Sequence, residues 1–312
     1  MKNDSLYWLS PINRGGYQFF REWLTEAWER DGGRIMRDLR IPWSVKMLLG
    51  KIGLVKPLCK NRPRRRLIVC AGGRVDYYVW PWCYAYEIVP IVWDCWPKYW
   101  PMMIEFVRRN RTRVLFCTSS QTAKYVQQKC PDVKSVWIPE GIRVESYAMG
   151  SNLVSRPIDI LEMGRQYKPV HHAIVGHSFK RHIKHLYQEG SQLLFKDFNE
   201  MTCGLRDSKI TICYPRCDTH PEMAGGIETL TQRYWECMLS GTLIAGRAPK
   251  ELIDFCGYNP VVTLGECPAE QLEELVANID SYQPLVYKNR EFAEHHAGWN
   301  KRINIIKEAL EG

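Results

Sequence analysis

The chain has 312 residues, of which 45% are hydrophobic and 25% charged, an ordinary composition for a globular protein. Its length favours two domains over a single core, and we expect a division into residues 1–150 and 151–312. No apolar run approaches the roughly 20 residues that span a bilayer, and no signal-peptide core follows Met1. These features exclude an integral membrane protein and predict a cytoplasmic location.

The net charge of +9 is confined to the N-terminal fifth of the chain. Residues 1–66 hold 15 Lys and Arg against 6 Asp and Glu, while the rest of the chain holds 28 of each. One class that fits this asymmetry is a basic, Trp-rich protein that binds nucleic acid or another polyanion. No base-reading motif accompanies the charge, so we expect no nucleic-acid partner.

Alternating apolar and helical patterns predict a parallel sheet in the first half of the chain. Strands are expected at 6–10, 67–71, 88–93, 114–117 and 136–138, and helices over 17–30 and 121–128. Ligands of such sheets bind outside the carboxyl ends of the strands. Gly15 and Gly16 follow the first strand, and Asp94 follows the third among aromatic residues of the kind that stack on sugars. Turn glycines and a helix-capping Asp94 are the structural alternatives.

Residues 43–66 combine an apolar stripe with many basic side chains. The stripe has helical spacing and consists of Val45, Leu48, Leu49, Ile52 and Val55. Lys46, Lys51, Lys60, Arg62 and the run Arg64-Arg65-Arg66 surround it, with Trp43 at one end. Such a segment suits peripheral contact with anionic headgroups on the inner face of the membrane. The alternative is that the stripe packs on its own domain and the arginines are solvated.

The second half of the chain predicts further strands at 158–163, 210–215, 242–245 and 261–264, and a last helix over 299–310. A helix is expected to begin near Glu228 and to stop at Gly241. Its buried face is predicted to carry Leu230, Tyr234, Trp235, Met238 and Leu239. Glu228 and Glu236, eight residues apart, would then project toward the same side.

The run Ala224-Gly225-Gly226 precedes Glu228 and would let the backbone approach a ligand closely. The N–H groups of the first helical turn, with their partial positive charge, suit phosphate. Carboxylates accept hydrogen bonds from sugar hydroxyls, so the whole stretch suits a sugar attached to a nucleoside diphosphate. Two ordinary glutamates on an exposed helix face are the alternative.

The same stretch resembles the E-x7-E signature of GT-B glycosyltransferases, especially the retaining enzymes of family 4. Ser240-Gly241-Thr242-Leu243-Ile244 and then Ala248-Pro249-Lys250-Glu251-Leu252-Ile253 follow in the order found in that family. Two departures stand out. Thr229-Leu230-Thr231 replaces the usual Gly-Phe-Gly, and Leu243 replaces the usual proline.

This resemblance implies an α/β fold in which two Rossmann-like domains face each other across a cleft. It implies transfer of a hexose-type sugar from a nucleotide-sugar donor to a glycan or lipid-linked glycan, in cell-surface polysaccharide synthesis. An inactive binding protein with the same fold is the alternative. No Asp-x-Asp occurs, and the spacing of the clustered histidines 171, 172, 177, 182 and 185 matches no standard ligand set, so we expect no metal and no cofactor.

The resemblance also assigns roles to single residues. Glu228 would meet the donor-sugar hydroxyls and Glu236 the nucleotide ribose, while Arg165 and Lys168 would hold the diphosphate, with Lys180 or Arg181 as substitutes for Lys168. Asp94 would contact the acceptor. The remaining candidates would line the donor or the cleft between the domains: Gly226, Ile227, Thr229, Gly164, Gly15 and Gly16.

Overall fold

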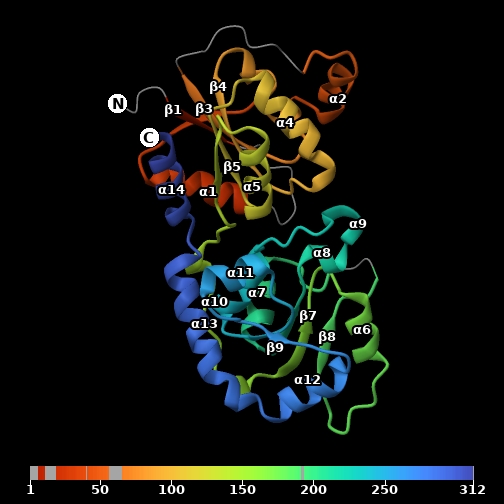
Figure 1. The fold of residues 1–312 in the computed structure, drawn as a ribbon. Helices are drawn as coiled ribbons and strands as arrows, with labels where there is room; N and C mark the ends of the chain where they lie inside the picture. The colour runs from red at the N-terminus through yellow and green to blue at the C-terminus, as the bar shows by residue number, and fades with distance from the viewer. Residues whose placement is uncertain (1–5, 11–18, 40, 56–64, 191–192, 312) are drawn as a thin grey trace. The chain divides into compact units, whose positions relative to one another are not determined.

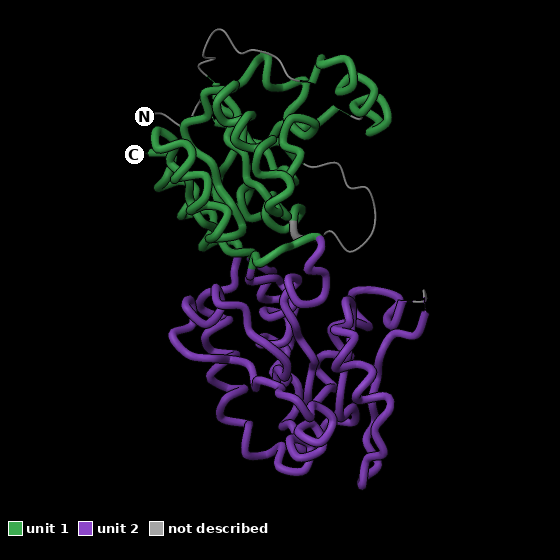
Figure 2. The backbone as a smooth tube through the Cα atoms, turned by 45° about the vertical axis from the view of Figure 1, so that its right-hand side comes forward, with its two compact units in different colours: residues 1–140, 223–227, 299–312 green, residues 141–222, 228–298 purple. Residues whose placement is uncertain are grey.

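A computed structural model describes residues 6–10, 19–39, 41–55, 65–190 and 193–311 (Figure 1). The chain forms two compact units (Figure 2). The first comprises Met1–Glu140, Met223–Ile227 and Trp299–Gly312, and the second comprises Gly141–Glu222 and Glu228–Gly298. The division therefore follows Glu140, ten residues before the expected boundary, and the C-terminal segment returns to the first unit. Gly15 and Gly16 lie outside the described residues.

The first unit is built on a six-stranded parallel sheet with the order β2-β1-β3-β4-β5-β6. Its strands are β1 (Leu6–Ser10), β2 (Arg34–Arg37), β3 (Arg66–Ala71), β4 (Glu87–Val92), β5 (Val114–Cys117) and β6 (Lys134–Trp137). The apolar runs that predicted β1, β3, β4 and β5 are largely buried in the sheet, whereas β6 is only half-buried. The sequence did not predict β2, a short edge strand with an arginine at each end.

Helices cover both faces of this sheet, with α1 and α14 together on one side and α4 and α5 on the other (Figure 1). The helices are α1 (Phe19–Arg30), α2 (Trp43–Lys51), α3 (Val75–Val79), α4 (Trp100–Arg109), α5 (Ser120–Lys129) and α14 (Trp299–Glu311). Trp299 packs edge-on against Trp93, with 6.3 Å between ring centroids. Arg302 donates from Nε to Pro139 O at 2.9 Å. These contacts explain why α14 belongs to the first unit.

The second unit contains a five-stranded parallel sheet with the order β11-β10-β9-β7-β8. Its strands are β7 (Ile158–Glu162), β8 (His185–Tyr187), β9 (Ser208–Cys213), β10 (Leu243–Gly246) and β11 (Val262–Thr263). Four of them coincide with predicted strands. The three residues of β8 are half-buried and give no apolar run, so the sequence did not reveal this edge strand.

The helices of the second unit pack on both faces of its sheet, with α12 beside α6 and α13 beside α10 (Figure 1). They are α6 (Lys168–Val175), α7 (Phe198–Arg206), α8 (Arg216–Thr219), α10 (Gln232–Ser240), α11 (Lys250–Cys256), α12 (Pro268–Ala277) and α13 (Gln283–His296). The short helix α9 (Pro221–Ala224) is divided between the two units. Among the helices of the described ranges, none is long and apolar enough to cross a membrane.

Candidate functional site

The helix that carries Glu236 begins at Gln232, so the expectation that it starts near Glu228 is wrong. Glu228 lies in the loop before α10 and does not share a helix face with Glu236. All five side chains predicted for the buried face are buried, but Leu230 lies in the loop before α10 and only the other four lie on the helix. Gly241 ends the helix in the left-handed conformation, with φ of 67°. The helical spacing therefore predicted the buried side of α10 correctly but placed the start of the helix too early in the chain.

Long-range hydrogen bonds hold the loop that contains Glu228. Its carboxylate accepts from Arg247 Nη1 at 2.6 Å and from the backbone N–H of Lys250 at 2.7 Å. In the reverse direction, Glu251 Oε2 accepts from the backbone N–H of Leu230 at 2.8 Å. This reciprocal pair of carboxylates fastens the loop to the first turn of α11, which explains why the chain is not helical at Glu228.

Arg247, directly after β10, is the centre of this network. Its guanidinium donates to Asp218 at 2.5 and 2.7 Å and to Cys217 Sγ at 3.1 Å, in addition to its bond with Glu228. The hydrogen bonds to Asp218 and then Glu228 raise the pKa of Arg247 above its ordinary value, against the opposing effect of burial. The cluster holds two carboxylates and one cation at the carboxyl end of β10.

Glu236 is oriented from two sides. Its Oε1 accepts from the hydroxyl of Tyr147 at 3.2 Å, and its Oε2 lies 2.9 Å from Arg233 Nη1. Burial and then the charge of Glu236 raise the pKa of the Tyr147 hydroxyl, so this hydroxyl stays protonated and donates. The other end of the Arg233 guanidinium reaches Gly164, where a Cβ atom would lie 3.5 Å from Nη2. Arg233 therefore connects Glu236 to the segment after β7.

The segment after β7 carries the two predicted phosphate-binding cations. Gly164 has φ of 78°, a conformation that favours glycine, and Arg165 and Lys168 are both exposed. Lys168 opens α6, so its side chain and the first N–H groups of the helix lie at the carboxyl end of the sheet. Gly164 and Glu236 therefore both lie close to Arg233.

Lys180 and Arg181 do not belong to this end of the sheet. They lie in the connection from α6 to β8, and β8 runs parallel to β7, so this connection is at the amino end of the strands. Their backbone N–H groups donate to Glu273 on α12 at 2.7 and 3.1 Å. The expectation that either could replace Lys168 is therefore wrong.

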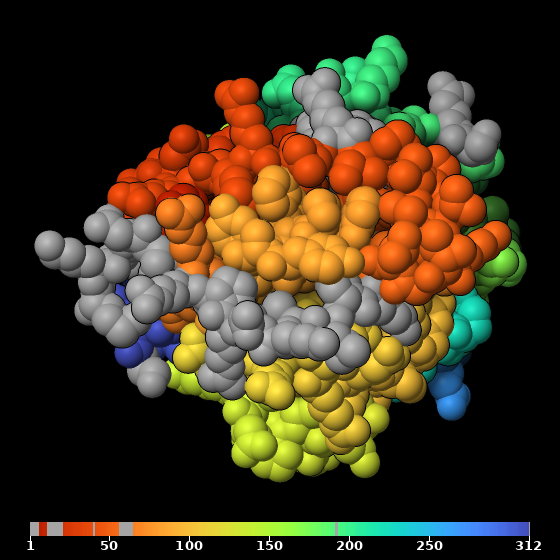
Figure 3. Space-filling model, turned by 90° about the horizontal axis from the view of Figure 1, so that it is seen from above, coloured from red at the N-terminus to blue at the C-terminus, as the bar shows by residue number. Residues whose placement is uncertain are grey.

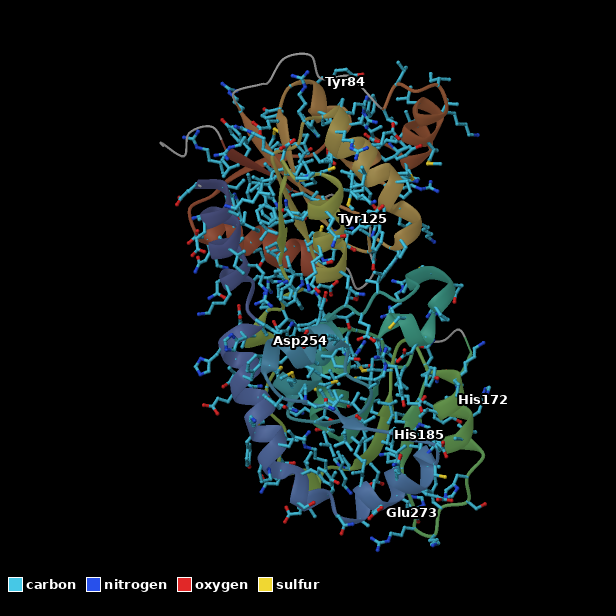
Figure 4. All side chains as sticks on the ribbon, in the orientation of Figure 1. Tyr84, Tyr125, His172, His185, Asp254 and Glu273 are labelled. Carbon is cyan, nitrogen blue, oxygen red and sulfur yellow. The ribbon has the colours of Figure 1, made fainter. Side chains whose placement is uncertain are left out.

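The clustered histidines divide into exposed and half-buried members. His172 lies on the outer side of α6, whereas His185 on β8 points into the unit (Figure 4). His171 Nδ1 lies 2.8 Å and His185 Nε2 3.4 Å from the carboxylate of Glu162, the last residue of β7. Within the described ranges, no group of three or more His, Cys, Asp or Glu is placed to hold a metal ion.

The remaining predicted residues are distributed over both units. Gly226 belongs to the first unit, where its carbonyl accepts from Gln121 at 3.1 Å, and Ile227 and Thr229 are buried. Asp94, also in the first unit, is exposed at the carboxyl end of β4 with φ of 48°. Few non-glycine residues adopt such a conformation, and those that do concentrate at functional sites.

Sequence reasoning missed Arg233, Arg247 and Tyr147. Arg233 is three residues before Glu236, and this i,i+3 spacing of opposite charges was a visible signal on a predicted helix. Arg247 and Tyr147 gave no local signal, because their partners are 19 and 89 residues away in the chain.

No protein-family model matches the sequence, and neither does any curated protein. Similar folds occur among solved structures. Anabaena HepE in complex with UDP and glucose has a TM-score of 0.57 at 10% identity, over 98% of this chain and 99% of HepE. An alpha-glucosyltransferase bound to UDP and a 13-mer DNA containing an HMU base has a TM-score of 0.60 at 12% identity, with the same coverage.

A glycosyltransferase from Rickettsia africae gives a TM-score of 0.51 at 9% identity, over 98% of both chains. Identities this low establish the fold alone. With two parallel sheets and these structural neighbours, the predicted fold class is confirmed: the chain has the α/β GT-B fold that these glycosyltransferases share.

Proposed function

We propose that the chain is a glycosyltransferase that moves a hexose-type sugar from a nucleotide-sugar donor to a glycan or lipid-linked glycan acceptor, in the synthesis of a cell-surface polysaccharide. The observation that carries this proposal is the connection of Gly164 to Glu236 through Arg233 at the carboxyl end of β7. Parallel sheets bind ligands at this end. The UDP and glucose held by the similar HepE structure support a nucleotide-sugar as the ligand.

The donor site combines an acceptor for hydroxyls with donors for phosphate. Glu236, held by Tyr147, would accept hydrogen bonds from the ribose hydroxyls. Arg165 would grip the diphosphate with its planar fork, and Lys168 would add a point charge at the start of α6. These cations would offset the charge that develops on the leaving nucleotide, so the reaction would proceed without a metal ion.

Glu228 would contact the hydroxyls of the donor sugar. Arg247 and the backbone N–H of Lys250 donate to its carboxylate and fix its orientation. We propose a retaining transfer in which the acceptor attacks the face that the nucleotide leaves, so no protein nucleophile is needed. Thr229, next to Glu228 in the second unit, would line the donor through its backbone.

The donor assignment is tested by thermal denaturation against a panel of UDP-, GDP-, ADP- and TDP-sugars, because a ligand that binds only the folded state raises the midpoint. One nucleotide series should stabilise the wild-type protein. Glu236→Gln should weaken that nucleotide about 10- to 100-fold, the effect of one or two strong hydrogen bonds. Equal affinity in both proteins would remove Glu236 from the site.

A binding protein without transferase activity is the second candidate. The observation that favours it is the hydrogen bonding of Glu228 to Arg247 and Lys250, which already occupies the first glutamate of the signature. Incubation with the stabilising nucleotide-sugar and a crude lipid extract, read by mass spectrometry, separates the two. Release of free nucleotide together with a glycosylated lipid supports the enzyme, and tight binding without release supports the binding protein.

We propose that Asp94 contacts the acceptor. Its strained backbone and exposed carboxylate follow Trp93 at the end of β4, next to buried Trp96. Asp94→Asn would remove one charge and keep the shape of the side chain. The expected result is a higher acceptor KM with unchanged donor affinity, whereas a change in donor affinity alone would contradict this role.

The proposal includes contact with an anionic membrane through α2 and its flanking residues. Val55 of the apolar stripe is fully buried, whereas Leu48 is 62% and Ile52 65% exposed. The face seen in Figure 3 includes this orange-red segment. The first unit exposes four other large apolar side chains, which lie in or next to the same region: Leu39, Val45, Leu54 and Tyr84. Tyr84 adjoins it because its hydroxyl donates to Leu54 O.

Exposed leucine and isoleucine favour a lipid surface over a nucleic acid, because a polyanion gains nothing from large apolar side chains. Exposed Arg37, Lys51 and Arg74 supply the charge that anionic headgroups attract. A lipid-linked acceptor would require this location at the inner face of the membrane.

The membrane contact is tested by sedimentation with vesicles of phosphatidylcholine alone or with 30% phosphatidylserine, and with duplex DNA as a competitor. The double variant Leu48→Asp/Ile52→Asp should lose at least about tenfold of the binding to anionic vesicles. Val154→Asp/Val175→Asp, at exposed valines of the second unit, is the matched control. Binding to DNA that survives the α2 variant, without binding to vesicles, would indicate a polyanion partner instead.

A further inference from the structure

Arg233 occupies the position between the two halves of the proposed donor site. Its Nη1 lies 2.9 Å from Glu236 Oε2, and its Nη2 lies against Gly164 at the carboxyl end of β7. In a nucleotide-sugar, the diphosphate lies between the ribose and the sugar. Arg233 lies between Glu236, the proposed ribose-binding carboxylate, and the proposed phosphate-binding segment after β7. It is therefore close to the expected position of the phosphate that is joined to the ribose.

The pair of Arg233 and Glu236 is incompletely satisfied. Arg233 Nη1 and Glu236 Oε2 are both buried atoms that make no well-directed hydrogen bond within the described part of the chain. Buried polar atoms without hydrogen bonds cost free energy, and a ligand with both donors and acceptors can complete them. Phosphate oxygens and ribose hydroxyls supply these two kinds of group.

Electrostatics require a cation at this place. A carboxylate close to a diphosphate would repel it, and Arg233 offsets the charge of Glu236 at the contact between the two. Burial lowers the pKa of this guanidinium, but the charge of Glu236 together with the smaller effects of Cys237, Cys213 and Tyr147 raises the pKa above its ordinary value, so the cation is permanent. An arginine presents five N–H donors and can serve a carboxylate and a phosphate at once.

We infer that Arg233 binds the phosphate that is joined to the ribose, and that it links this phosphate to Glu236. The inference rests on the proposed function and adds to it a third cation beside Arg165 and Lys168. It also implies that the nucleoside diphosphate product is held by the same contact. The contrasting role is purely positional, in which Arg233 orients Glu236 toward the ribose and touches no phosphate.

Ligands with fewer phosphates distinguish the two roles. The experiment measures the affinities of UDP, UMP and uridine for the wild-type protein and for Arg233→Gln, by calorimetry or by displacement of UDP. If the thermal denaturation panel shows that the protein prefers another base, the diphosphate, monophosphate and nucleoside of that base replace UDP, UMP and uridine. Loss of a charged hydrogen bond to phosphate should weaken UDP and UMP roughly 10- to 100-fold and change uridine less than about twofold.

Two further variants complete the design. Arg233→Lys keeps the positive charge but loses the planar guanidinium, so its affinity for UDP and UMP should lie between those of the wild-type protein and Arg233→Gln. This variant replaces Arg233→Gln in the experiment if Arg233→Gln does not fold. Arg30→Gln breaks the exposed pair with Glu26 on α1 and should change no affinity.

Each other outcome overturns the inference. Equal loss for uridine and UDP would show that Arg233 acts only through Glu236, and unchanged UDP affinity would remove Arg233 from the site. A wild-type protein that binds no nucleoside diphosphate would instead contradict the proposed function itself, so the two failures are distinguishable.

Discussion

The two units use their arginines in different ways. In the first unit, Arg302 is 1% exposed and donates to the backbone carbonyls of Pro139 and Glu140 at 2.9 and 3.1 Å. In the second unit, Arg233 and Arg247 face side-chain carboxylates beside the carboxyl ends of β7 and β10. An arginine that serves backbone carbonyls contributes to folding. One that serves carboxylates at the ligand-binding end of a sheet can share its remaining donors with a ligand.

The exposed surfaces differ in a corresponding way. Six of the ten large apolar side chains exposed in the described chain belong to the first unit, and five of these six lie from Leu39 to Leu54, in and around α2. The second unit instead gathers ion pairs next to its strand ends. We therefore propose that the first unit makes surface contacts and that the second unit binds charged ligands.

The largest effect on stability is expected for Arg302→Met in the first unit. Two buried carbonyls would lose their donor, at a cost of about 3 kcal/mol in the free energy of unfolding. Urea denaturation followed by tryptophan fluorescence measures this loss. Arg66→Met, which removes a less buried bond to Leu310 O, is the control and should cost about 1 kcal/mol. Altered nucleotide affinity in Arg302→Met would contradict a purely structural role.

A smaller loss is expected for Arg247→Met in the second unit. Asp218 and Glu228 would face each other without a cation, but both are partly exposed, so we expect about 1–2 kcal/mol. Adding Asp218→Asn to this variant removes the repulsion and should restore part of the stability. Thermal denaturation of the single and double variants checks this. No recovery in the double variant would mean that repulsion between the carboxylates is not the cause.

Gly241→Ala tests how much the packing at the end of α10 contributes to the free energy of unfolding. The left-handed backbone disfavours alanine by about 1 kcal/mol, and the new Cβ would lie only 3.1 Å from Met149. Gly257 ends α11 in the same conformation, with φ of 73° and nothing within 4 Å of its Cβ position. Gly257→Ala should therefore show the conformational cost alone, and Gly241→Ala a larger loss in the same denaturation assay. Equal losses would show that Met149 yields without cost.

Cysteine reactivity should differ between the units without any change in stability. Burial raises the pKa of the Cys70 and Cys117 thiols in the first sheet to about 12, so few thiolates form at pH 8. Cys267 in the second unit is exposed. Alkylation at pH 8 followed by peptide mass spectrometry should modify Cys267 first and leave Cys70 and Cys117 unmodified until the protein unfolds. Early modification of either would indicate local opening of the first sheet.

The sequence predicted the parts of the fold that depend on local pattern. β1 and β5 were predicted with the observed bounds, because apolar runs in buried parallel strands are continuous. The edge strands β2 and β8 were missed, since they are short and only half-buried. The return of α14 to the first unit was also missed, because it depends on contacts such as Trp93 with Trp299 that connect distant parts of the chain.

The candidate site was predictable only in part, for the same reason. The sequence placed Glu236 on a helix and Arg165 after a strand, as the structure does. The start of α10 was misplaced because Glu228 is fixed by Arg247 and Lys250, which no helical period reveals. The roles of Glu228, Asp94 and the phosphate-binding cations stay predictions until ligands are measured.

The most direct test of the central claim is the binding of the selected nucleoside diphosphate, measured by calorimetry, to the wild-type protein, to Glu236→Gln and to the α2 variant Leu48→Asp/Ile52→Asp. The account predicts that Glu236→Gln binds about 10- to 100-fold more weakly, while the α2 variant binds like the wild-type protein. Unchanged affinity in Glu236→Gln, or an equal loss in the α2 variant, would contradict the assignment of the donor site to the second unit.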